Sequence, residues 1–149
     1  AENPFADPFE LRVLRLKKKI EAGADFMQTQ CIFNLPTFRK WMEEVRALGL
    51  HEEIKILAGI TPIKSAGMAN YMKKSVPGMD VPQEIIDRIA AQEKGAPQQA
   101  EGKKLAVEMI REITEIEGVA GVHIMAVEWE AAVPEIVEAA GLMPRPAVA

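Results

Sequence analysis

The sequence has one cysteine, two histidines and no long apolar run, and each shortage excludes a class of protein. Cys31 cannot form a disulfide within the chain, so a reducing, cytoplasmic setting is the default expectation. His51 and His123 lie far apart and offer no metal-ligand spacing, so we expect no metal site. No run of about 18 apolar residues is present, so we predict no membrane span.

A positive net charge is also absent, because 22 acidic residues outnumber 18 basic ones for a net charge of −4. This balance argues against nucleic acid as the main partner, since phosphate binding needs a basic footprint. The charge is unevenly distributed: residues 1–74 carry 12 basic and 9 acidic side chains, and residues 75–149 carry 6 and 13. The basic excess therefore lies in the first half of a chain whose 149 residues and 48% hydrophobic content suit one globular unit.

Hydrophobic periodicity, bounded by glycine and proline, predicts alternating helices and strands. We expect helices over 9–22, 36–48, 65–74, 83–94, 98–116 and 131–140, and strands over 25–33, 54–60 and 118–127. The segment around His51 is expected to be an exposed loop. Strands separated by helices imply parallel pairing through right-handed crossovers, so the predicted fold class is α/β.

The predicted strands are almost continuously apolar, as in KILAGI and VHIMAV, which is typical of a sheet buried on both faces. Three strands are few for such a sheet, and a (βα)₈ barrel typically needs about 250 residues. The chain is therefore expected to form part of a larger α/β domain.

Gln30 lies at the carboxyl end of the first predicted strand, where α/β folds place ligand sites. Its amide offers both donors and acceptors, which suit the edge of a pterin or flavin ring. The alternative is a glutamine that satisfies backbone groups at a strand end, and the sequence leaves both interpretations open.

A basic stripe runs along the first predicted helix. Arg12, Arg15 and Lys19 follow i, i+3, i+7 spacing, and Lys18 lies beside them. Such a stripe could hold a phosphate or pyrophosphate through charge-assisted hydrogen bonds. Most charge runs are solvated helix faces, and taken alone the spacing favours that alternative.

Three segments taken together resemble the C-terminal half of methylenetetrahydrofolate reductase: AGADFMQTQCIF, KILAGITPI and GVAGVHIMAV. The resemblance runs from Asn3 to Arg145, and the stretches NPFADPFELRV and HIMAVEWE are similar to the branch found in anaerobes with one-carbon acetyl-CoA chemistry. The family implies a flavin-dependent (βα)₈ TIM barrel that interconverts 5,10-methylenetetrahydrofolate and 5-methyltetrahydrofolate in one-carbon metabolism. Residues 1–149 would form roughly its last three strands with their helices, as a fragment of a longer chain.

The resemblance also implies roles for particular residues. Thr29 and Gln30 match the pair that contacts the folate pterin, and Arg12, Arg15, Lys18 and Lys19 fall at the positions that contact FAD. Met68 and Met72 stand where the family has a glutamine and a phenylalanine that touch substrate or nicotinamide. The family's general acid lies in the first half of the barrel, so no catalytic residue is expected in this chain.

The implied partners are the folate substrate and an electron donor, either NAD(P)H or an accessory redox protein. A second interpretation is a non-catalytic half-barrel that serves as a binding or assembly module. Such a half-barrel exposes two sheet edges and an inner layer of side chains, so it should be an oligomer. A third is a barrel enzyme with a different cofactor, since fold alone does not fix chemistry.

Overall fold

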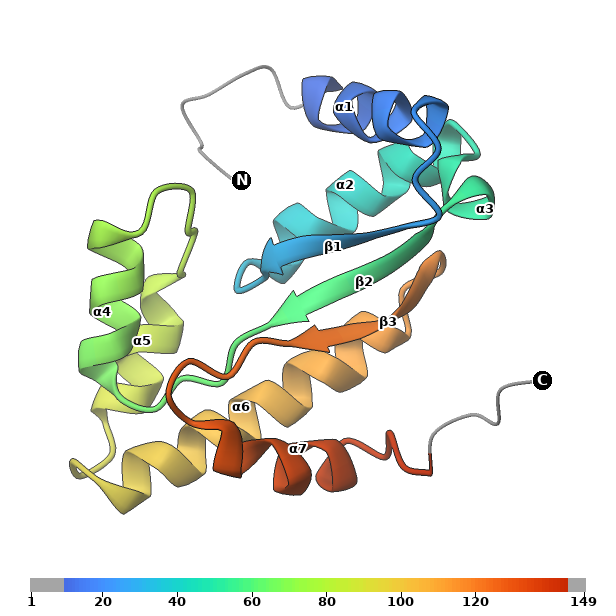
Figure 1. Cartoon of the computed structure of the whole chain (residues 1–149). Helices are drawn as coiled ribbons and strands as arrows, with labels where there is room; N and C mark the ends of the chain where they lie inside the picture. The colour runs from blue at the N-terminus through green and yellow to red at the C-terminus, as the bar shows by residue number, and fades with distance from the viewer. Residues whose placement is uncertain (1–9, 145–149) are drawn as a thin grey trace.

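The computed structural model describes residues 10–144, in which helices alternate with three strands (Figure 1). The elements in chain order are α1 (Glu10–Glu21), β1 (Phe26–Cys31), α2 (Leu35–Ala47), α3 (Leu50–Glu53), β2 (Lys55–Ile60), α4 (Ala66–Ser75), α5 (Gln83–Ala90), α6 (Ala96–Thr114), β3 (Val119–Ile124), the 3₁₀ turn η1 (Glu130–Ala132) and α7 (Val133–Ala139).

The strands form one parallel sheet in the order β1-β2-β3, which confirms the predicted α/β class and parallel pairing. Each predicted strand is present, and local signals fix several helix ends. Asn34 caps α2 by accepting the N–H of Thr37 at 3.0 Å, and Ser65 caps α4 by accepting the N–H of Met68 at 3.2 Å. The expected loop around His51 is instead the short helix α3.

One face of the sheet packs against helices and forms the core. Ile56, Ala58 and Ile60 of β2 are each at most 1% exposed. The same buried cluster takes in residues from both neighbouring helices, Phe38, Met42 and Val45 of α2 and Met109, Ile110 and Ile113 of α6. Burial of these apolar side chains provides the main stabilisation of the described part of the chain.

The other face of the sheet is open, so the prediction of burial on both faces is wrong for the described residues. In β1 burial alternates, and Phe26 is 58% exposed. Gly121 and His123 of β3, which pair with Leu57 and Gly59, are only half-buried. No helix crosses the face of the sheet turned to the viewer in Figure 1. In a closed barrel this face is the interior, which side chains from the other strands fill.

Helices α4 and α5 lie beyond the carboxyl ends of the strands, on the left of Figure 1. Arg88 of α5 ties this region to α6 through ion pairs with Glu101 at 2.5 Å and Glu108 at 2.6 Å. The hydrogen bond from Arg88 lowers the pKa of the Glu108 carboxyl below its usual value. At its start, α6 passes directly against the β2–α4 connection, because a Cβ on Gly102 would overlap the carbonyl oxygen of Ile63.

None of the helices in residues 10–144 is long and apolar enough to cross a membrane.

Candidate functional site

A pocket of about 440 Å³ lies between α1, α2 and β1. Its lining comes from three stretches of chain: Arg12, Arg15, Leu16 and Lys19 of α1; Met27, Gln28, Thr29, Gln30 and Ile32 of β1 and just beyond; and Phe38 and Trp41 of α2. Four consecutive strand residues contribute, so the pocket borders the edge of β1 that no described strand pairs with. The structure thus brings the predicted basic stripe and the predicted Thr29-Gln30 pair to one place.

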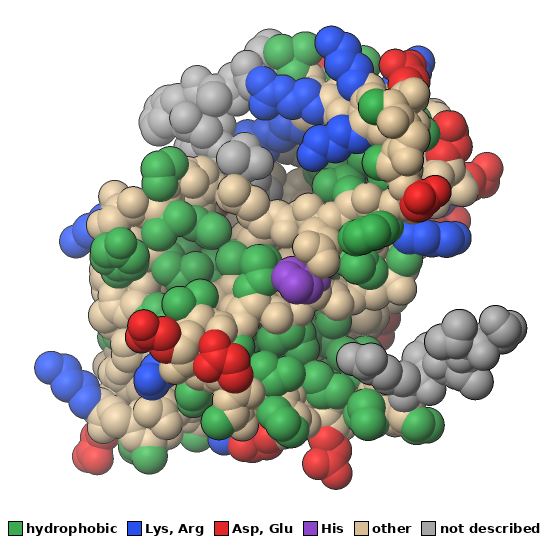
Figure 2. Space-filling model, viewed as in Figure 1, with side chains coloured by type: hydrophobic (Ala, Val, Ile, Leu, Met, Phe, Trp, Pro, Cys, Tyr) green, Lys and Arg blue, Asp and Glu red, His purple; other side chains and the backbone are tan. Residues whose placement is uncertain are grey.

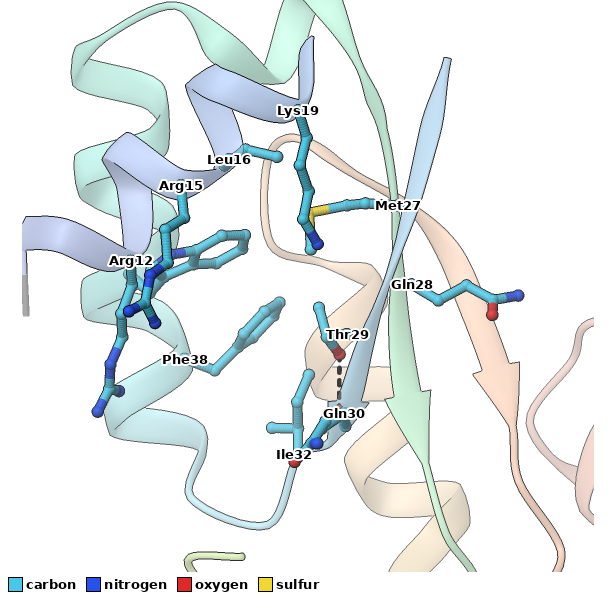
Figure 3. Close-up of a pocket in the computed structure, with 11 residues that line it drawn as sticks. Arg12, Arg15, Leu16, Lys19, Met27, Gln28, Thr29, Gln30, Ile32 and Phe38 are labelled. Carbon is cyan, nitrogen blue, oxygen red and sulfur yellow. Dashed lines mark hydrogen bonds between the residues drawn. The ribbon is translucent and has the colours of Figure 1, made fainter. Parts of the chain in front are cut away.

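The close-up shows how these side chains lie (Figure 3). Lys19 projects from α1 toward β1, Arg15 points down on the side of Phe38, and Arg12 extends down beside α2 (Figure 3). Gln28 lies on the opposite side of β1 from Arg15 and Phe38. Gln30 lies at the carboxyl end of the strand beside Thr29.

Thr29 sits in an irregularity of the β1–β2 pairing. The pairing register shifts between Gln28 and Cys31, and the Thr29 hydroxyl makes its hydrogen bonds at this point of the strand. It accepts the buried N–H of Gly59 at 2.8 Å and donates to the carbonyl of Gln30 at 2.8 Å. This hydroxyl is therefore engaged by the backbone, and the predicted contact of Thr29 with substrate stays a prediction.

The Gln30 side chain, in contrast, makes no hydrogen bond within residues 10–144. The sequence left open whether the backbone or a ligand would use this amide, and here Thr29 satisfies the backbone at the strand end. Two donors and two acceptor lone pairs of the Gln30 amide are thus available to a ligand.

Replacing Thr29 with valine is expected to lower the free energy of unfolding by about 1–3 kcal/mol, because the buried N–H of Gly59 loses its acceptor. Thr29→Ser keeps the oxygen and is the matched control, with an expected loss below about 1 kcal/mol from the missing methyl group. Urea unfolding of the two variants measures the difference. Equal stability of the valine and serine variants would show that the hydroxyl does not hold the strand irregularity.

The cations of α1 form a positively charged rim. Lys and Arg side chains gather over α1 at the top of Figure 2. Arg12, Arg15 and Lys19 line the pocket, whereas Lys18 is exposed and does not. Successive helix residues are rotated by about 100° around the helix axis, so Lys18 points in a different direction from Lys19. Cationic side chains of this kind can bind an anion through charge-assisted hydrogen bonds.

Phe38 and Trp41 were not predicted as site residues. Their rings stack with centroids 5.9 Å apart and an interplanar angle of 26°. They lie one helical turn apart on α2, so their spacing indicated a shared face but not a pocket. Together with Leu16 and Ile32 they give the pocket apolar lining in addition to its cations.

Met68 and Met72 do not line this pocket. Both lie on α4, where the Met68 sulfur accepts the N–H of Lys64 at 3.4 Å and Met72 is 7% exposed in the core. Their contact with substrate stays a prediction.

Chemically, the pocket offers cations, amides and apolar side chains for binding a ligand. Its lining includes no aspartate, glutamate, histidine or cysteine among the described residues. Cys31, next along the strand, faces the Thr61 hydroxyl at 2.7 Å, and burial raises the pKa of its thiol. No cluster of three or more metal-binding side chains occurs in the described residues. A cationic rim with an apolar, aromatic side suits a ligand that combines a ring with phosphates or carboxylates.

Three parallel strands in sequential order, joined by helices on one face and open on the other, define a segment of a (βα)₈ barrel. The profile of the family described as methylenetetrahydrofolate reductase matches residues 2–141. The chain belongs to this family, and the family resemblance of the sequence is confirmed.

Individual relatives agree with this assignment. Methylenetetrahydrofolate reductase 1 of Schizosaccharomyces pombe is 30% identical over 139 residues, which cover 92% of this chain and 22% of the relative. A probable methylenetetrahydrofolate reductase (NADPH) of Caenorhabditis elegans is 27% identical over 94% of this chain and 21% of its own length. The chain thus spans about a fifth of the length of these relatives.

One solved structure supports the fold. It is described as an uncharacterized protein from Clostridium thermocellum that binds two copies of 5-methyl-5,6,7,8-tetrahydrofolic acid. It matches with a TM-score of 0.62 and 16% identity, over 86% of this chain and 46% of that one. The predicted partial barrel is therefore confirmed as the fold class of this chain.

Proposed function

We propose that this chain is the folate- and flavin-contacting part of an oxidoreductase that interconverts 5,10-methylenetetrahydrofolate and 5-methyltetrahydrofolate. The observation that carries the proposal is a pocket in which the amide of Gln30 and the cations of α1 converge, in a member of this family. The binding of 5-methyl-5,6,7,8-tetrahydrofolic acid by the Clostridium thermocellum protein supports the same class of substrate.

Gln30 would bind the pterin ring, since its amide can pair with both donors and acceptors on the ring edge. Thr29 would act mainly by fixing the backbone of Gln30 through the hydrogen bond to its carbonyl. Met68 and Met72 would form a soft apolar wall on α4. These assignments follow the family pattern residue by residue.

Arg12, Arg15 and Lys19 would bind the phosphates of FAD, with Lys18 contributing charge from outside the pocket lining. The donor set fits the group, because three cations and the Phe38–Trp41 pair match a ligand with phosphates and aromatic rings. Bound FAD would supply the two-electron chemistry that this chain's own side chains lack.

The general acid and the electron donor would come from outside this chain. Residues 1–149 would be the C-terminal half of a longer barrel, working in the cytoplasm in the one-carbon metabolism that feeds methionine biosynthesis. The donor would be NAD(P)H or an accessory redox protein, and the NADPH in the name of the Caenorhabditis elegans relative supports the first.

The flavin assignment is tested by Lys19→Met, with Lys17→Met as control. Lys17 is exposed on the same helix and lies outside the pocket lining, so the two variants remove the same charge from α1. Loss of one charge-assisted contact of about 1.5–3 kcal/mol is expected to weaken FAD binding roughly tenfold or more in Lys19→Met only. Flavin fluorescence titration measures the dissociation constants. If FAD binding weakened equally in both variants, the effect would come from net charge alone, and Lys19 would not belong to the site.

A non-catalytic assembly module is the second candidate, favoured by the open sheet face with its exposed Phe26. An unpaired sheet edge and an apolar face of this kind favour association. Sizing chromatography tests the module, because a well-behaved 16 kDa monomer would count against it.

A further inference from the structure

One asparagine links the start of α2 to the connection between α4 and α5. Asn34 follows β1, and its Oδ1 accepts the N–H of Thr37, which caps α2. Its Nδ2 donates to the carboxylate of Asp80 at 2.7 Å, in the α4–α5 connection. The two partners are 46 residues apart in the chain. Both polar atoms of the Asn34 amide are therefore used, one within its own helix and one in a distant segment.

The hydrogen bond between Asn34 and Asp80 joins two well-anchored segments. Both side chains are half-buried, and a carboxylate acceptor makes such a bond shorter and stronger than one between neutral groups. Val81, next to Asp80, is buried in the core, as are Ile32 and Phe33 just before Asn34. Because buried residues adjoin both partners, the bond fixes two segments of chain relative to each other and not merely two side chains.

Other bonds hold α4 and α5 from the opposite direction. Arg88 of α5 forms its ion pairs with two glutamates of α6. Gln98, buried at the start of α6, accepts the N–H of Ala66 at 3.2 Å and donates to the carbonyl of Gln92 at 3.2 Å. These bonds attach α4 and α5 to α6, whereas the hydrogen bond of Asp80 attaches the connection between them to the end of β1.

We infer that Asn34 and Asp80 are positioning residues, which hold α4 at a fixed distance from the end of β1. The inference rests on the proposed function, in which Gln30 binds the pterin and Met68 of α4 forms an apolar wall. Gln30 lies four residues before Asn34, and α4 leads directly into the connection that carries Asp80. The hydrogen bond therefore ties together the two segments between which the folate is proposed to bind, without either partner touching the ligand.

Asn34→Asp in the full-length protein is expected to weaken the binding of 5-methyltetrahydrofolate about tenfold and to leave FAD binding within about twofold. Aspartate caps a helix as well as asparagine does, so α2 and its pocket residues keep their place. A carboxylate at this position cannot donate to Asp80 and is repelled by it. Isothermal titration measures the folate constant and flavin fluorescence the FAD constant, so a general loss of structure is distinguished from a loss of position.

The matched control combines Asn34→Asp with Asp80→Asn. This exchange keeps the net charge of the wild type and lets an amide at position 80 donate to a carboxylate at position 34. The folate affinity is expected to return to within about threefold of the wild type. Urea unfolding verifies that each variant is folded, and Asp80→Ala, which removes the acceptor without adding a charge, replaces Asn34→Asp if that variant does not fold.

Three results would overturn the positioning role while leaving the proposed function in place: a folate affinity unchanged in Asn34→Asp, an equal loss of folate and FAD affinity, or no recovery in the exchanged pair. Failure of the wild-type protein to bind 5-methyltetrahydrofolate would overturn the proposed function and this inference with it.

Discussion

Gln30→Glu is expected to weaken the binding of 5-methyltetrahydrofolate by about 100-fold while the flavin content of the protein stays the same. The glutamine amide is exposed at the carboxyl end of β1 and has no hydrogen-bond partner among the described residues. Glutamate keeps the size of the side chain but replaces its two N–H donors with an acceptor. Donors lost at a polar ring edge cost about 1–3 kcal/mol, and at the upper end this corresponds to about 100-fold.

Gln92→Glu is the matched control for this prediction. Gln92 is an exposed glutamine that follows α5 and does not line the pocket. The substitution introduces the same charge outside the pocket, so it should leave folate affinity within about twofold. Isothermal titration with 5-methyltetrahydrofolate measures both variants. Equal affinities of Gln30→Glu and the wild type would remove Gln30 from the site.

Gly102→Ala is expected to lower the free energy of unfolding by about 3 kcal/mol, at the upper end of the range for overpacking. A Cβ at this position would overlap the carbonyl oxygen of Ile63 and lie 2.9 Å from its carbonyl carbon. Both atoms belong to the backbone of a residue that is 1% exposed, so neither can rotate away. The helix α6 or the β2–α4 connection must move instead.

Gly67→Ala provides the control for Gly102→Ala. Gly67 lies in α4, and the nearest atom to its added Cβ is the Ser65 hydroxyl at 3.7 Å, an ordinary contact. Alanine in a helix is favoured over glycine by about 0.5–1 kcal/mol, so this variant should be as stable as the wild type or slightly more so. Urea unfolding of both variants decides the matter. A Gly102→Ala protein with wild-type stability would contradict the close packing of α6 on Ile63.

Local signals in the sequence were sufficient for most of the fold. Each predicted strand is present, and the parallel order follows from helices that separate the strands. The helix expected over 83–94 ends earlier, at Ala90, where a polar stretch follows. The helix α3 was not predicted, because the segment around His51 is short and charged. The structure also shows that the ring Nδ1 of His51 is buried and has no hydrogen-bond partner among the described residues.

Composition alone does not show whether each face of the sheet is buried or exposed. The apolar runs in β2 and β3 predict that these strands are buried, and the helices bury one face of the sheet. Whether the second face is covered depends on which strands lie across it, and that information is not contained in the periodicity of these strands.

The candidate site was predictable in part. The helical spacing of Arg12, Arg15 and Lys19 placed them on one face, and the structure adds that this face borders β1. The role of Thr29 depends on an irregularity in strand register, which a single strand sequence does not reveal.

The most direct test of the proposed function is the absorption spectrum of the purified full-length protein, recorded during titration with 5-methyltetrahydrofolate under anaerobic conditions. The mass of the intact chain is read from the same sample. We expect flavin absorbance on a chain at least as long as a complete barrel of about 250 residues, and loss of that absorbance as 5-methyltetrahydrofolate is added. A stable protein that carries no flavin, takes up none when FAD is added and does not bind 5-methyltetrahydrofolate would contradict the reductase assignment.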